Sequence, residues 1–227
     1  MRSRASWLFN TILLCTVSSA TQNALAASTT LEYKGFAYGS TSGTIYADLN
    51  PAKYGLESMS TVAGGFNMIE KSTGTSLIAW CVDVFHALNS KFEYTIGNSS
   101  QLNRADDLQK LVNQRYAEVT DKKTSTAFQL AIWEIVTDTG GGYSLANGTF
   151  QASGFGNAQA LAGNWLKLDG KTTGNYKINY FYDGIMNDKT IAQNLISISS
   201  VPLPGAAILM LSALGLGGLL HRRRRIA

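Results

Sequence analysis

The sequence contains few cysteines and histidines, and this shortage argues against a metal centre built from those residues. Its 227 residues include two of each, and only Cys81 and His86 lie outside the two terminal segments described below. A zinc site of the usual kind needs three or four such ligands. We therefore expect no bound metal and no other cofactor.

Basic charge is also scarce outside the ends of the chain. The formal net charge is +4, but Arg2, Arg4 and Arg222–Arg225 supply six of the 19 basic residues. The central part therefore holds 13 basic residues against all 15 acidic ones, and carries a charge of about −2. Without a basic stripe, binding to nucleic acid has no electrostatic support.

The first 26 residues have the layout of a secretory signal peptide. Two arginines precede an apolar run over residues 7–17, and Ala24-Leu25-Ala26 supplies the small residues that precede a cleavage site. We expect the secretion machinery to export the chain and cleavage to follow Ala26. Cys15 is then removed, so the exported chain carries one cysteine, Cys81, which has no partner for an internal disulfide.

Strand-like patterns come first and last along the rest of the chain, and helical patterns lie between them. The predicted strands cover 31–36 and 44–47 as a pair, 62–69, 76–84, 92–96 against the strand before it, 176–182 and 191–198. The predicted helices cover 104–116, 124–136 and 157–168. This order predicts an α+β domain over residues 27–200, with β-sandwich-like strands, a central buried helix and two further helices.

The central helix is predicted from residues 124–136. Eight of these thirteen residues are apolar, none is Gly or Pro, and a Thr/Ser run opens the segment. Because the helix is apolar nearly all round, we expect it to be buried. Gln129, one turn before Trp133, is the exception, and a buried carboxamide needs partners for its donors and its acceptor. Either ordinary hydrogen bonds satisfy Gln129, or its chemistry has changed.

Residues 201–227 form a separate segment with three parts. Pro202-Leu203-Pro204 ends the last strand, residues 206–220 are all apolar or small, and the chain closes with Arg222, Arg223, Arg224 and Arg225. The apolar part spans about 22 Å as a helix, and only the longer stretch from residue 201 reaches across a bilayer. The arginines favour the cytoplasmic side, which places the domain outside. A single transmembrane helix that acts as a plain anchor is one interpretation.

These three parts in this order resemble the PEP-CTERM sorting signal of Gram-negative bacteria, in its Pro-Leu-Pro variant. The resemblance implies a partner, the membrane protease-transpeptidase called exosortase, which recognises the tail. It also implies that the protein sits in the inner membrane facing the periplasm before processing. Afterwards it would reach the cell surface or an extracellular matrix of exopolysaccharide and biofilm.

A second resemblance concerns the domain itself. Trp80-Cys81-Val82-Asp83 and Gln129-Leu130-Ala131-Ile132-Trp133 resemble the paired motifs of bacterial surface thioester domains, with Cys81 and Gln129 separated by 48 residues. In that family the cysteine sulfur and the glutamine side chain join as an internal thioester, which reacts with nucleophiles on a target. The resemblance implies that Cys81 is the thiol, that Gln129 is the acyl donor and that Trp133 packs around the bond. The partners would be surface amines or a polysaccharide.

The residues themselves leave alternatives open. Cys81 could be a small buried hydrophobe on a strand, in a non-covalent structural or binding module of the exopolysaccharide matrix. A cysteine hydrolase would need His86, but five positions along one strand put two side chains on opposite faces, and no orienting partner is evident. Glu134 and Asp138 are interpreted as the rim of a helix rather than a catalytic pair. We therefore expect a protein that is not an enzyme.

Overall fold

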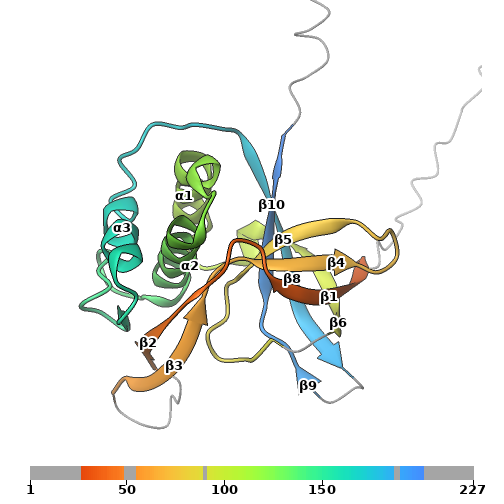
Figure 1. Ribbon diagram of the computed structural model, residues 1–227, viewed down its shortest axis with the longest axis horizontal. Coiled ribbons are helices and arrows are strands. Elements are labelled where there is room, and N and C mark those ends of the chain that lie inside the picture. Colours follow the sequence, from red (N-terminus) through yellow and green to blue (C-terminus); the bar gives the residue numbers. More distant parts are fainter. Residues whose placement is uncertain (1–26, 49–54, 89–90, 187–189, 202–227) are drawn as a thin grey trace, which may run out of the picture.

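The computed structural model describes residues 27–48, 55–88, 91–186 and 190–201, which form an α+β domain with three helices (Figure 1). The strands are β1 (Ser28–Phe36), β2 (Thr41–Ala47), β3 (Glu57–Ala63), β4 (Phe66–Glu70), β5 (Ser76–Cys81), β6 (Lys91–Asn98), β7 (Phe150–Ser153), β8 (Tyr176–Met186), β9 (Thr190–Ile191) and β10 (Leu195–Ser200). The helices are α1 (Ala105–Arg115), α2 (Lys122–Thr137) and α3 (Asn157–Trp165). The predicted α+β class is therefore confirmed.

The larger sheet closes on itself as a barrel. Its strands follow the order β10-β5-β4-β1-β6-β8, and β8 also pairs with β10, so the ring is complete. All of its neighbouring strands are antiparallel, and the short β9 adds only to β8. The sequence predicted a sandwich, but β10 inserts between β5 and β8 and closes the sheet. A closed ring leaves no unpaired edge.

The smaller sheet has three strands, in the order β3-β2-β7. The chain passes from this sheet into the barrel at Gly64-Gly65, between β3 and β4. A Cβ atom at Gly64 would lie 2.8 Å from the carbonyl oxygen of Gly39, and one at Gly65 would lie 2.7 Å from the Trp80 ring. The crossing is therefore too crowded for any residue with a side chain.

Three strand predictions are wrong for reasons of topology. The single strand expected over 62–69 is two strands, because the glycine crossing interrupts it. The first two strands do not pair, since β1 belongs to the barrel and β2 to the small sheet. The strand around 92–96, now β6, pairs with β1 and β8 and not with the strand that carries Cys81.

Helix α2 lies at the centre of the domain, as predicted. It contacts α1, α3, all three strands of the small sheet and β5. Asp121 caps its N-terminus by accepting a hydrogen bond from the Thr124 N–H at 2.8 Å. Eleven of its 16 residues are buried, whereas α1 and α3 bury four and three. The three helices lie together on one side of the barrel (Figure 1).

Both predicted targeting segments lie outside the described residues. These are the signal peptide and the tail with its Pro-Leu-Pro and arginine motifs. Among the helices that the structure describes, none is both long enough and apolar enough to cross a bilayer.

Candidate functional site around Cys81 and Gln129

Cys81 is the last residue of β5, and its side chain belongs to the inner face of the barrel. The pairing of β5 with β4 and β10 puts Leu77, Ala79 and Cys81 on the same face, since side chains alternate along a strand. Cys81 is only 2 % exposed. It is a free thiol.

Gln129 takes the place of a missing strand beside Cys81. Strand β4 begins at Phe66, opposite Ala79, so it does not extend as far as Cys81. The Gln129 amide fills this position: its Oε1 accepts a hydrogen bond from the Cys81 N–H at 3.0 Å, and its Nε2 donates to the Cys81 carbonyl oxygen at 2.8 Å. The fully buried amide thereby pairs both backbone groups of Cys81 and satisfies its own burial.

The sulfur of Cys81 has its own surroundings. Its S–H donates to the Asp83 carbonyl oxygen at 2.9 Å, and the Asp83 N–H donates back to the sulfur at 3.3 Å. Burial raises the pKa of the thiol to about 12, while the Trp133 indole N–H and the Asp83 N–H work against that rise. The thiol is therefore protonated at neutral pH and shielded from solution reagents.

Tyr94 is a neighbour of the thiol that the motifs did not reveal. It is fully buried on β6, and its hydroxyl donates to the Gln193 carbonyl oxygen at 3.4 Å. Burial, chiefly, and the nearby Cys81 raise the pKa of Tyr94. Only the barrel closure brings β6 and β5 to face each other, so no sequence spacing could have identified this proximity.

Asp83 links the thiol to His86. Strand β5 ends at Cys81, and the following residues turn so that the Asp83 carboxylate meets His86 Nδ1 at 2.6 Å and accepts from the Phe85 N–H at 2.9 Å. His86 therefore has an orienting carboxylate, contrary to the sequence interpretation. The expected separation of Cys81 and His86 on one strand does not apply either, because His86 lies in a loop.

Glu134 and Asp138 form a second buried polar cluster on the same helix, so describing them as a helix rim was wrong. Glu134 is fully buried and Asp138 is 1 % exposed. Glu134 Oε1 accepts from the Ser144 N–H at 2.6 Å. Its Oε2 accepts from no donor among the described residues, but a protonated Glu134 can donate to the adjacent Asp138 carboxylate. Burial, chiefly, and the adjacent Asp138 raise the pKa of Glu134 to about 7.

Asp138 remains the ionised member of that pair. Hydrogen bonds from the Gly140 N–H, the Thr149 N–H and the Thr149 hydroxyl, at 2.9, 3.1 and 2.7 Å, lower its pKa against the opposing effect of burial. Backbone donors of the 140–149 loop thus converge on the two carboxyls. This arrangement anchors the loop to the end of α2.

The structure brings four of the five motif residues together. Around Cys81 lie Gln129, Asp83 and Trp133. Trp80 lies on the other face of β5, where the centroid of its ring is 4.8 Å from that of Phe128. Trp133 is 4 % exposed, and its N–H has no oxygen or nitrogen partner within the described part of the chain. In that part, no group of three or more acidic, His or Cys side chains is arranged to hold a metal ion.

Comparison with known proteins gives no match to a protein-family model, a curated protein or a solved structure.

Proposed function

We propose that the protein is an exported surface protein that forms an internal thioester between Cys81 and Gln129 and attaches covalently to nucleophiles on a target. The observation that supports this most strongly is the pair of hydrogen bonds between the Gln129 amide and the Cys81 backbone. They hold the acyl group beside the single cysteine of the exported chain. The burial of both residues excludes the water that would hydrolyse a thioester.

The proposed bond forms by acyl transfer within the chain. The Cys81 sulfur attacks Gln129 Cδ, a C–S bond forms, the C–N bond breaks, and the amide nitrogen leaves as ammonia with the thiol proton. The Cys81 N–H already donates to Gln129 Oε1, so it would stabilise the negative charge that develops on this oxygen. In the second step a target amine attacks the same carbon, the C–S bond breaks, and the sulfur regains a proton.

The thiol needs help to begin this reaction, because its raised pKa keeps it protonated. The thiolate is the attacking form. The Trp133 and Asp83 N–H groups already favour the thiolate, and they are the two groups in the site that would stabilise it. Once formed, the bond would be protected by the same burial that makes its formation difficult.

A non-covalent matrix-binding module is the second candidate function. The observation that favours it is the satisfied state of Gln129, whose acceptor and donor both have partners without any covalent bond. In that case Cys81 is an inert buried thiol. Both candidates share the export signal and the sorting tail, through which we propose exosortase processing and a final place at the cell surface or in the extracellular matrix.

Intact mass measurement of protein isolated from cells separates the two candidates. With the thioester, the chain weighs one ammonia less than its sequence. Methylamine then adds to Gln129 and frees Cys81 for alkylation. Cys81→Ala and Gln129→Ala each abolish the deficit, and the double variant behaves like either single one.

Gln114→Ala is the matched control, because Gln114 is a buried glutamine on α1 that bonds to the backbone of Leu168 and Gly170 and not to a cysteine. This variant should keep the mass deficit. Full sequence mass in fresh protein that has never been heated would reject the thioester and leave the non-covalent module.

A further inference from the structure

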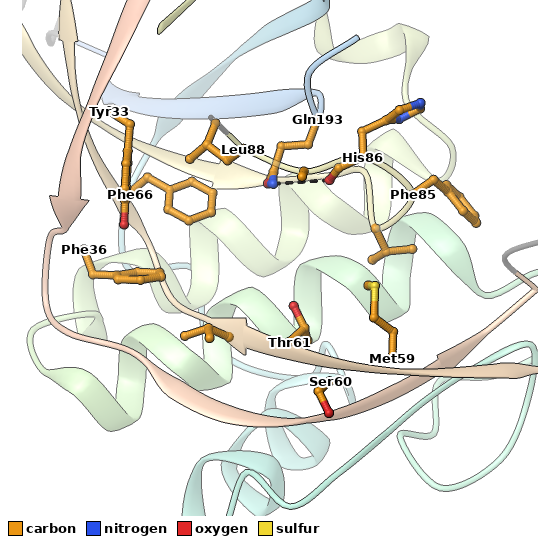
Figure 2. A pocket seen from close by; sticks show the side chains of 13 residues that line it. Tyr33, Phe36, Met59, Ser60, Thr61, Phe66, Phe85, His86, Leu88 and Gln193 are labelled. Carbon is orange, nitrogen blue, oxygen red and sulfur yellow. Dashed lines mark hydrogen bonds between the residues drawn. The ribbon is translucent and has the colours of Figure 1, made fainter. Parts of the chain in front are cut away.

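Outside the Cys81 site, a pocket lies between the small sheet and the barrel (Figure 2). Its volume is about 480 Å³. One wall is the segment Met59–Val62 of β3, and the opposite wall includes the loop residues 84–88 and Gln193. Tyr33, Phe36 and Phe66 close one end with rings that contact one another.

The pocket lies along the edge of β3 and not only over its face. Successive side chains of a strand point to opposite faces, so a pocket above one face contacts alternate residues. This pocket contacts four consecutive residues of β3. Figure 2 shows Thr61 and Met59 directed toward the pocket and Ser60 directed the other way. Ser60 therefore lines the pocket through its backbone, which an occupant of the pocket can approach.

In the described structure, the edge of β3 that faces away from β2 has no strand beside it. Within the described residues β3 pairs only with β2, because the small sheet ends there. Unpaired backbone N–H and C=O groups at a sheet edge are the usual receptor for an added strand. The barrel offers no comparable edge in its closed ring.

The lining of the pocket indicates the chemistry of the occupant. None of its 13 residues is Lys, Arg, Asp or Glu. Phe85 is one of the exposed large hydrophobic side chains, at 54 %. Gln193 is 8 % exposed; its Nε2 donates to the His86 carbonyl oxygen, but its Oε1 is buried without a donor among the described residues. An apolar group accompanied by a hydrogen-bond donor suits this lining.

We propose that an extended peptide segment of a partner protein docks here, adding a strand to the edge of β3 and placing an apolar side chain in the pocket. Only a peptide supplies both the regularly spaced backbone groups that the edge lacks and the neutral side chain that the lining favours. The docking does not depend on the thioester. It would bring a bound protein to the loop that follows Asp83, whose backbone contacts the Cys81 sulfur.

The test uses the full chain and a short blocked peptide in which valine or leucine alternates with threonine. Fluorescence anisotropy of the labelled peptide measures binding, and hydrogen exchange measures protection of the backbone amides of β3. We expect binding, with slower exchange over Glu57–Ala63. The same peptide with alternate nitrogens methylated should lose binding, because it cannot donate to the edge.

Thr61→Lys should weaken binding about tenfold or more by placing a charge in the pocket, toward which the Thr61 side chain is directed (Figure 2). Ile96→Lys is the matched control: Ile96 is 38 % exposed, also on a strand, and does not line the pocket. Absence of binding, equal binding of the methylated peptide, or equal effects of the two lysine variants would each overturn the proposal. Cys81→Ala should bind the peptide as the wild type does, so the result is independent of the thioester.

Discussion

Helix α2 buries four polar residues completely, and two of them, Gln129 and Glu134, have contrasting surroundings. Gln129 is neutral, and both ends of its amide are paired with the Cys81 backbone. Glu134 pairs one oxygen with the Ser144 N–H, and its other oxygen, which no donor in the described structure reaches, can pair with the Asp138 carboxylate only when it carries a proton. The amide therefore behaves as part of a sheet, whereas the carboxyl carries a raised pKa.

The difference shows how the charge of a group decides its effect on stability when it is buried. A carboxamide with its partners adds hydrogen bonds and no pH dependence. A carboxyl group in the same helix makes the stability depend on pH, because burial disfavours its ionised form. Substitutions of Trp133, Gln129 and Glu134 test this contrast.

Removing the Trp133 side chain, which lies beside the thiol, should have the largest effect. Trp133 lies one turn after Gln129 on α2 and is 4 % exposed. The centroid of its ring is 6.4 Å from that of Phe150. Trp133→Ala should lower the free energy of unfolding by about 3–5 kcal/mol through lost burial and a cavity. Urea unfolding measures this. Trp133→Phe should lower the free energy of unfolding much less, since the indole N–H has no oxygen or nitrogen partner in the described residues. If Trp133→Ala melted as the wild type does, the packing of Trp133 would contribute no stability.

Removing the amide should cost somewhat less. In a Cys81→Ala background, where no thioester can form, Gln129→Leu leaves the N–H and C=O of residue 81 without partners. We expect a loss of about 2–4 kcal/mol in the free energy of unfolding. Gln129→Glu should approach the stability of the Cys81→Ala parent at acid pH, where a protonated carboxyl can accept and donate, and lose stability as pH rises. A Gln129→Leu variant as stable as its parent would show that these two hydrogen bonds contribute nothing.

Removing the ionisable group of Glu134 should have the smallest effect, confined to a pH window. The pKa of Glu134 rises from 4.5 to about 7 on folding. The folded state therefore holds the proton more tightly, so the stabilisation is present below pH 4.5 and is lost as pH rises through about 7. Asp138, whose pKa is lowered, stays ionised across this window.

Glu134→Gln should remove a fall in stability on the order of 2 kcal/mol between these limits. The measurement is the urea midpoint of both proteins at several pH values. Parallel curves would show that Glu134 does not titrate in this range.

The sequence predicted the helices well and the arrangement of the strands poorly. The central helix over 124–136 and its burial follow from a local apolar pattern, which the sequence displays directly. Barrel closure depends on β10 meeting both β5 and β8, and no local pattern encodes such pairing. The short strand β7 lies between glycine-rich loops and was missed, because four residues give too little alternation to recognise.

The candidate site was predictable where it depended on motifs and not where it depended on the fold. Cys81, Gln129 and Trp133 were singled out from the sequence, and they lie together. Tyr94 was missed because only the closed barrel brings it near the thiol. The contact between His86 and Asp83 was missed because β5 ends earlier than predicted. The burial of Glu134 and Asp138 depends on the 140–149 loop, whose path the glycines do not specify.

The position of β10 also determines how the domain would carry mechanical load. β10 is the last described element before Val201, it is bonded to a strand on each side, and its first residue, Leu195, lies opposite Cys81. A pull at Val201 along the strand would act on two hydrogen-bonded ladders at once. If a target were attached at Gln129, tension would run through β10, β5 and α2 and would bypass α1 and α3. Resistance to force would then depend on the rate at which β10 slides from its neighbours rather than on the equilibrium stability of the helices.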